Sequence, residues 1–254
     1  MITLSHSGSG RDLVLLPGWG SDGTIFSSLL PALEGHFRVH LGRWHQHTHP
    51  ALSSDELLKT IREDLIHQLE HQDSQQAIWV GWSLGGLIAT DMAQHHPEKV
   101  IGLMTIAFNP CFVQQADWLC AMPEDEFTRF QEAYVNEPIE TLNRFMALQG
   151  LGAVDRRNLQ KLLKKSQCSI PIQQQAALLN LLRKDLRPAI AQLAIKQMHC
   201  YGELDALVPA SELTMALTYL NPHVQTRCYA AATHLPFISA KDAWLKDLLE
   251  WCAV

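Results

Sequence analysis

Short apolar runs alternate with amphipathic segments along most of the chain. The runs rich in strand-forming residues are 13–16, 37–41, 77–80, 100–107, 197–201 and 224–229. Segments with apolar positions at helical spacing follow most of these runs, at 25–33, 55–70, 84–96, 210–220 and 241–252. Because strands that alternate with helices form parallel sheets, this pattern predicts an α/β core.

One long segment departs from the alternation. Between about residues 111 and 187 the pattern is helical and contains no clear strand. We therefore expect a core made of 1–110 and 188–254, interrupted by a helical cap at 111–187. An insert at this place covers the carboxyl ends of the strands, where α/β proteins hold their active sites.

Composition narrows the class of protein. The 254 residues are 47% hydrophobic and 18% charged, which suits one globular domain with a large core. A net charge of −6 argues against nucleic-acid binding, and no apolar run reaches the length of a membrane span. The start lacks a signal-peptide pattern, and the six cysteines contain no C-x-x-C pair. We expect a cytoplasmic monomer with reduced thiols and neither a nucleic-acid nor a membrane partner.

The strongest chemical signal is the sequence Gly81-Trp82-Ser83-Leu84-Gly85. It matches G-x-S-x-G, the turn that carries the nucleophilic serine of many hydrolases, and it lies between a strand and a helix as that turn must. A side chain at Gly81 or Gly85 would collide with the neighbouring strand and helix, so the pattern predicts a strained turn with Ser83 exposed at the helix N-terminus. A glycine-rich strand–helix turn without chemistry is the plainer interpretation.

A nucleophilic serine needs a base, and the base needs an acid that fixes its tautomer. In hydrolases of this kind the acid and then the histidine follow the serine along the chain. Asp205 lies deeper in the loop after 197–201 than Glu203, so we prefer Asp205 as the acid. His234 lies in the loop after the last predicted strand, whereas His223 precedes that strand, so we predict His234 as the base.

The loop 17–23 follows the first predicted strand and is rich in Gly and Pro. In serine hydrolases this loop supplies one oxyanion-hole amide, and the residue after the nucleophile supplies the other. We therefore expect the backbone N–H groups of Trp19 and Leu84 to form the oxyanion hole. A simple Gly/Pro turn is the alternative.

Three histidines, His45, His47 and His49, alternate in the segment after 37–41. In an extended chain they would face one way and could bind a metal. Because no Cys, Asp or Glu lies close by, we favour a histidine-rich surface loop and predict no metal site.

Together these stretches resemble the α/β-hydrolase superfamily over the whole chain. More narrowly, the sequence is similar to the family of pimeloyl-[acyl-carrier protein] methyl ester esterases of biotin synthesis. The segments that carry the narrower resemblance are 81–86, 110–112, 144–149, Tyr201-Gly202 with Asp205 and 207–209, and His234 with 236–239.

The resemblance implies Ser83 as nucleophile, Asp205 as orienting acid and His234 as general base, with no cofactor. It also implies that Ser83, His234, Trp19, Leu84, Phe145, Met146, Ala147, Leu148 and Gln149 contact the substrate. Two features depart from the family pattern. Pro17-Gly18 replaces the usual His-Gly before the oxyanion-hole tryptophan, and the histidine-rich segment around Trp44 replaces the family's glycine-rich loop.

Charge is unevenly distributed. Residues 143–187 contain nine basic and two acidic side chains, a local charge of +7, which leaves −13 for the remainder. A predicted helix near 155–166 would present Arg157 and Lys161 opposite its leucine face. This is either an ordinary solvated face or a docking patch for an acidic partner. The resemblance implies acyl-carrier protein as that partner, with Arg144, Arg157 and Lys161 in the docking positions and Glu140 where an arginine is usual.

We therefore expect an esterase that removes the methyl ester from a carrier-bound pimeloyl chain through an acyl-enzyme. A general short-chain carboxylesterase, or a C–C bond hydrolase or lyase on the same fold, is the first alternative. A binding protein that kept the fold without chemistry is the second.

Overall fold

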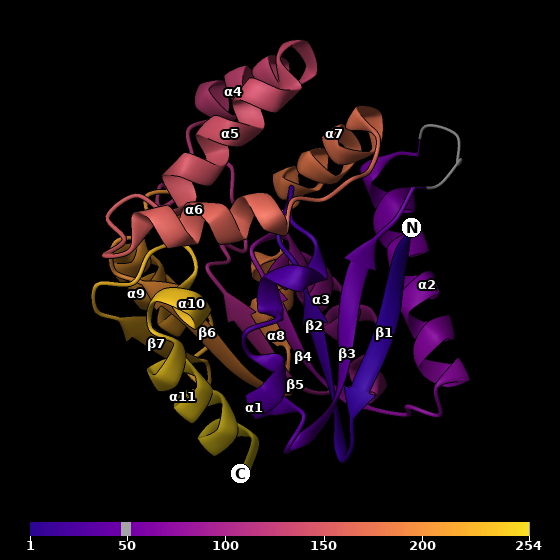
Figure 1. Ribbon diagram of the computed structural model, residues 1–254. Coiled ribbons are helices and arrows are strands. Elements are labelled where there is room, and N and C mark those ends of the chain that lie inside the picture. Colours follow the sequence, from indigo (N-terminus) through magenta and orange to yellow (C-terminus); the bar gives the residue numbers. More distant parts are fainter. Residues whose placement is uncertain (47–51, 254) are drawn as a thin grey trace.

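The computed structural model describes residues 1–46 and 52–253 (Figure 1). Seven strands form one sheet in the order β1-β3-β2-β4-β5-β6-β7, and every neighbouring pair is parallel except β1 with β3. The mostly parallel α/β sheet is thus confirmed. The strands are β1 (Ile2–Gly8), β2 (Arg11–Leu16), β3 (Phe37–Trp44), β4 (Ala77–Trp82), β5 (Val100–Ile106), β6 (Lys196–Gly202) and β7 (Gln225–Tyr229).

Helices cover both faces of the sheet. On one face α2 (Ser54–His71), α3 (Leu84–His95), α8 (Arg187–Gln192) and α9 (Ala210–Leu220) pack side by side. On the other face lie α1 (Leu30–Leu33), α10 (Pro236–Ser239) and α11 (Lys241–Ala253). Short 3-10 turns, η1 (Gly23–Phe26) and η2 (Pro97–Lys99), complete this part. The single helix predicted over 25–33 is wrong, because that stretch forms η1 and α1 with a break between them.

Local sequence explains the longest helix. Ser53 accepts a hydrogen bond from the backbone N–H of Glu56, and the Glu56 carboxylate accepts one from the backbone N–H of Ser53. This reciprocal capping box starts α2. Its five buried side chains face the sheet at helical spacing: Leu57, Leu58, Ile61, Leu65 and Leu69.

Between β5 and β6 the chain forms a separate group of helices. They are α4 (Glu124–Asn136), α5 (Pro138–Gln149), α6 (Arg156–Lys165), α7 (Ile172–Asn180) and the 3-10 turn η3 (Leu181–Arg183). Figure 1 shows α4 to α7 above the upper end of the sheet, where the parallel strands have their carboxyl ends. We refer to α4 to α7 with their connections as the cap. None of the described helices is long and apolar enough to cross a membrane.

Backbone strain is concentrated at this same end of the sheet. Ser83 (φ 53°), Ala107 (φ 48°) and Ala231 (φ 55°) all have positive φ, although none is glycine. They follow β4, β5 and β7 respectively. Positive φ costs an L-residue about 1–2 kcal/mol, so three strand ends are held in conformations that the chain disfavours on its own.

Candidate active site

Ser83 lies at a sharp turn between β4 and α3. Its φ of 53° and ψ of −116° project the side chain away from the sheet edge. A Cβ on Gly81 would lie 2.1 Å from the carbonyl oxygen of Gly85, and one on Gly85 would lie 2.2 Å from that of Leu16. The predicted collisions at these two glycines are therefore confirmed, and they explain why the turn holds Ser83 tightly.

Asp205 and His234 meet although 29 residues separate them. The Nδ1 of His234 donates to Oδ2 of Asp205 at 2.8 Å, and both side chains are at most 1% exposed. The other carboxylate oxygen of Asp205 accepts from the backbone N–H groups of Leu207 (2.8 Å) and Val208 (3.1 Å). This arrangement fixes the carboxylate and leaves Nε2 of His234 free to act as a base. Glu203, the rejected alternative, is exposed.

Trp82 contacts both the backbone and the ring of His234. Its indole Nε1 donates to the backbone oxygen of His234 at 2.9 Å, and the two rings lie 5.7 Å apart. The Nε2 of His234 is buried and has no hydrogen-bond partner among the described residues. It lines the same pocket as Ser83. Catalytic hydrogen bonds often tighten only when substrate binds, so this geometry suits a base that waits beside its nucleophile.

The predicted oxyanion hole consists of two backbone amides, those of Leu84 and Trp19. Leu84 is the first residue of α3, so its N–H has no acceptor within the helix. The loop after β2 packs against the turn, because a Cβ on Gly18 would lie 3.2 Å from the Cβ of Ser83. Trp19 follows directly, with its indole Nε1 donating to the backbone oxygen of Gln175 at 2.8 Å. The loop that carries Trp19 thus packs against the Ser83 turn, and the oxyanion hole formed by the Trp19 and Leu84 amides stays a prediction.

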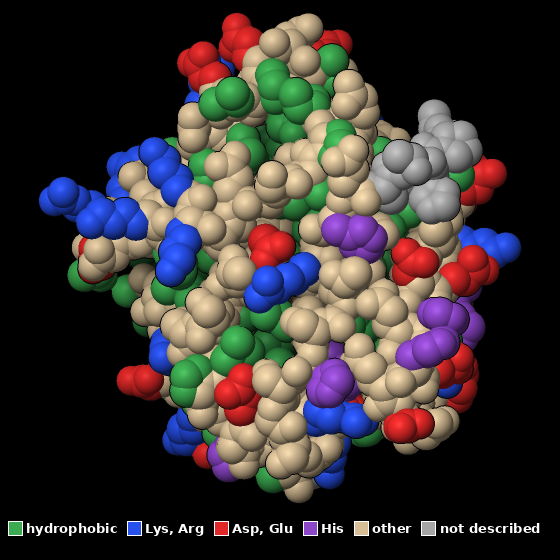
Figure 2. All heavy atoms as spheres, turned by 45° about the vertical axis from the view of Figure 1, so that its right-hand side comes forward, with side chains coloured by type: hydrophobic (Ala, Val, Ile, Leu, Met, Phe, Trp, Pro, Cys, Tyr) green, Lys and Arg blue, Asp and Glu red, His purple; other side chains and the backbone are tan. Residues whose placement is uncertain are grey.

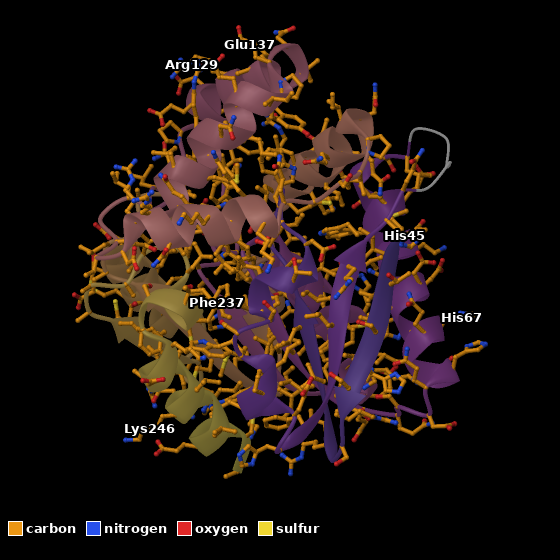
Figure 3. The ribbon with its side chains drawn as sticks, viewed as in Figure 1. His45, His67, Arg129, Glu137, Phe237 and Lys246 are labelled. Carbon is orange, nitrogen blue, oxygen red and sulfur yellow. The ribbon has the colours of Figure 1, made fainter. Side chains whose placement is uncertain are left out.

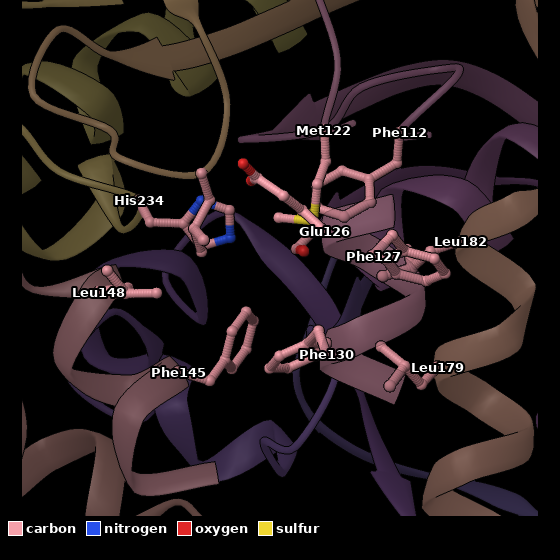
Figure 4. A pocket seen from close by; sticks show the side chains of 12 residues that line it. Phe112, Met122, Glu126, Phe127, Phe130, Phe145, Leu148, Leu179, Leu182 and His234 are labelled. Atoms are coloured by element: carbon pink, nitrogen blue, oxygen red, sulfur yellow. The ribbon is translucent and has the colours of Figure 1, made fainter. Parts of the chain in front are cut away.

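A pocket of about 200 Å³ opens beside Ser83 and His234 (Figure 4). Nearly all of its other lining side chains are apolar, and most come from the cap. They are Phe112, Met122, Glu126, Phe127, Phe130, Phe145, Leu148, Leu179, Leu182 and Leu207. A pocket of this kind receives a hydrocarbon chain and leaves its reactive end at the polar pair.

The sequence located part of this lining. Phe145 and Leu148 of α5 line the pocket as the resemblance implied. Met146 and Gln149 are buried on the same helix, Ala147 is half-buried, and none of these three is among the lining residues. Their contact with substrate stays a prediction. The lining residues of α4 were missed, although Phe127 and Phe130 recur at a helical spacing that signals a buried face.

The tryptophan of the first loop supports this lining from behind. The Trp19 ring is 2% exposed and packs edge-on against Phe130, Tyr134 and Phe145 at centroid distances of 4.9–5.6 Å. These contacts therefore couple the loop after β2 to α4 and α5, two of the cap helices that line the pocket.

The basic side chains of the cap divide into two groups. Those that form ion pairs are Arg129 with Asp125 and Arg144 with Glu140, and the basic residues that follow α7 are also paired: Arg183 with Glu124, Lys184 with Asp55, and Arg187 with Asp117 and Asp185. Those on α6 are exposed and form no ion pair with any described residue: Arg156, Arg157, Lys161, Lys164 and Lys165. Figure 2 shows Lys and Arg side chains gathered at the height that α6 has in Figure 1. The free positive charge of the cap is thus concentrated on one helix.

Only the start of the histidine-rich segment, up to Gln46, lies within the described residues, and His45 does not line the pocket. His47 and His49 lie outside the described residues. His45 lies at the upper end of β3, across the sheet from Phe237 (Figure 3). Burial lowers the pKa of His45, and its Nε2 lies 2.7 Å from the amino group of Met1. Within residues 1–46 and 52–253, no group of His, Cys, Asp and Glu side chains could hold a metal ion.

Comparisons with known proteins agree with this geometry. A model of the "Alpha/beta hydrolase family" matches residues 13–246. A "Pimeloyl-[acyl-carrier protein] methyl ester esterase" from Vibrio cholerae is 37% identical over 249 residues, which cover 96% of this chain and 95% of that protein. A protein of the same name from Edwardsiella ictaluri is 36% identical, with coverages of 95% and 93%.

Solved structures show the same fold at lower identity. An esterase from Exiguobacterium antarcticum superposes with a TM-score of 0.85 at 18% identity, covering 100% of this chain and 96% of that one. A bromoperoxidase from Bacillus anthracis gives 0.84 at 18% identity, with coverages of 100% and 95%. The family match and the curated relatives leave one conclusion: the chain belongs to the alpha/beta hydrolase family.

Proposed function

We propose that this protein is a serine carboxylesterase that hydrolyses the methyl ester of pimeloyl-[acyl-carrier protein], releasing methanol and the free acid for biotin synthesis. The observation that carries the proposal is the buried Asp205–His234 pair, whose free Nε2 shares an apolar pocket with Ser83. The substrate is inferred from the names of the relatives given above, which are similar to this chain over nearly its whole length.

The reaction follows from the positions of these groups. Ser83 Oγ attacks the ester carbonyl while Nε2 of His234 takes the hydroxyl proton. The amides of Trp19 and Leu84 donate to the oxyanion as the tetrahedral intermediate forms. Methanol leaves with the proton from His234, which gives an acyl-enzyme at Ser83. Water, deprotonated by the same imidazole, then attacks the acyl-enzyme and releases the carboxylic acid.

The cap accounts for the choice of substrate in this proposal. Residues 111–187 act as a cap whose inner side receives the acyl chain and whose outer helix α6 carries unpaired cations. Acyl-carrier protein is acidic, so α6 with Arg157 and Lys161 attracts it and lowers the energy of the docked complex. Arg144 contributes less to docking than its charge suggests, because it already forms an ion pair with Glu140 at 2.5 Å.

The direct test measures methanol release from methyl pimeloyl-[acyl-carrier protein]. Ser83→Ala should lower kcat by at least about 10⁴-fold with an unchanged melting temperature. Ser211→Ala, on the exposed start of α9, is the matched control and should behave as wild type. The wild-type gene should also restore growth without biotin to a strain that lacks the esterase. Substantial turnover by Ser83→Ala would refute the assignment of the nucleophile.

Two alternatives have different consequences. A general short-chain carboxylesterase, or a C–C hydrolase or lyase, would not prefer carrier-linked substrate over a small ester. A binding protein without chemistry would fail to react with a fluorophosphonate probe. The intact hydrogen bond between Asp205 and His234 argues against this second alternative, because a site that only binds ligand has no need to hold a histidine tautomer.

A further inference from the structure

The lining of the pocket contains one group that an apolar chain does not need. Glu126 lies on α4 and lines the pocket together with Phe127 and with Phe130, four residues later on the same helical face. Figure 4 shows its carboxylate end on the side of the pocket that carries His234. Glu126 is exposed, so its carboxylate lies at the mouth of the pocket, where it faces solvent and also an entering chain.

The charge of Glu126 is not neutralised by its neighbours. Arg129, one helical turn along α4, is held by Asp125 at 2.7 Å, and Figure 3 shows Arg129 at the outer end of the cap. Arg183 is held by Glu124 at 2.5 Å and lies over the Phe127 ring. Among the described residues Glu126 forms no ion pair and no side-chain hydrogen bond. A negative charge is thus left at an apolar pocket whose wall includes the catalytic histidine.

We propose that Glu126 is a specificity-determining residue that excludes acyl chains bearing a free carboxylate and favours chains whose two ends are both esterified. Like charges at the mouth of an apolar pocket repel each other, and water and salt screen only part of this repulsion. A methyl ester or a thioester is neutral and meets no such repulsion. A free carboxylate, on an unesterified substrate or on the newly formed product, does.

This inference rests on the proposed function and adds two consequences to it. The pocket prefers a pimeloyl chain whose far end is masked by the carrier. Hydrolysis then creates a carboxylate beside Ser83, and repulsion from Glu126 speeds its departure.

One small diester and its half-ester test the idea without the carrier. Dimethyl pimelate has no charge, whereas monomethyl pimelate carries one carboxylate. The measured quantity is the ratio of kcat/KM for dimethyl pimelate to that for monomethyl pimelate, at pH 7.5 and low salt. In Glu126→Gln this ratio should fall about tenfold, the scale of one partly screened charge pair, with the change chiefly in KM for the half-ester.

Glu132→Gln is the matched control. It removes the same charge from the same helix, and Glu132 is exposed and does not line the pocket. Its ratio should equal that of wild type. Product inhibition by monomethyl pimelate during dimethyl pimelate hydrolysis gives a second measurement. Its inhibition constant should fall about tenfold in Glu126→Gln.

An unchanged ratio in Glu126→Gln, or an equal change in Glu132→Gln, would overturn the role of Glu126. Neither result would contradict the proposed function, which is tested by turnover of the carrier-linked ester. Conversely, a tenfold fall in the ratio together with no turnover of the carrier-linked ester would support the role of Glu126 and reject the carrier-linked substrate.

Discussion

The core and the cap hold their functional residues in different ways. In the core, Ser83 is fixed by backbone contacts that leave no room for a Cβ at Gly81 or Gly85. In the cap, the pocket is formed by side chains on helices that pack against one another, and some of the cap's charges form exposed ion pairs. Exposed pairs contribute about 0–1 kcal/mol each. The core therefore fixes the chemistry, whereas the cap can change its substrate by single substitutions.

The largest effect is expected from a change in the core, at the hydrogen bond between Asp205 and His234. Asp205→Asn keeps the size of the side chain but removes the carboxylate that holds Nδ1–H of His234. We expect kcat to fall about 10⁴-fold, because the imidazole then adopts the wrong tautomer. The fall should be the same for a carrier-linked ester and for p-nitrophenyl butyrate, since both use the same histidine. Glu203→Gln, on the exposed neighbour, should leave both rates intact. A loss confined to one substrate would contradict the division between core and cap.

A second change concerns the stability of the core and its pH dependence. Burial lowers the pKa of His199 to about 3. Its Nδ1 lies 2.6 Å from the hydroxyl of Thr105, on the neighbouring strand. Below about pH 6.5 the unfolded chain binds a proton at this residue, while the folded protein does so only near pH 3. The unfolded state thus binds more protons between these values, so stability falls as pH falls.

His199→Gln keeps a polar side chain but removes the titration. Between pH 7 and pH 5 the wild-type protein should lose about 2 kcal/mol more unfolding free energy than the variant. Urea unfolding followed by tryptophan fluorescence measures this difference, and the other histidines contribute equally to both proteins. Parallel pH profiles would show that His199 is not the source of the acid sensitivity.

The smallest effect sharpens the comparison from the side of the cap. Reversing the charges of Arg157 and Lys161 to Glu should lower the preference for carrier-linked over small ester about tenfold, by weakening an electrostatic contact at the protein surface. Added salt should reduce the same preference in the wild-type protein, and less in the variant. Arg129→Glu, at the outer end of α4, is the matched control. Equal losses on both substrates would favour a general esterase.

The sequence is most informative where function depends on strand ends. Asp205 and His234 each follow a strand, and β6 and β7 are neighbours, so their side chains could be expected to meet. β1 was not predicted, because only Ile2 and Leu4 of its residues with strand pattern are buried and the rest face solvent at the sheet edge. An edge strand with one short apolar side gives a weak pattern.

The sequence is least informative where function depends on how helices pack. The position of Glu126 in the pocket follows from the packing of α4 against α5 and α7, and no local pattern specifies it. The nine basic residues of 143–187 looked alike in the sequence, yet Arg183 and Lys184 are paired with Glu124 and Asp55, far away in the chain. Only the fold shows that the unpaired cations are those of α6.

The positive φ values of Ala107 and Ala231 have a practical consequence. Glycine adopts such angles freely, so replacing either alanine with glycine would remove strain from the folded chain. It would also give the unfolded chain more conformational freedom, and the two changes have opposite effects on the free energy of unfolding. Where the loss of strain in the folded state outweighs the added freedom of the unfolded chain, the protein would become more stable to heat. Its loops would then hold the reacting groups less firmly. Directed evolution toward heat resistance would therefore meet its first conflict with turnover at these two alanines.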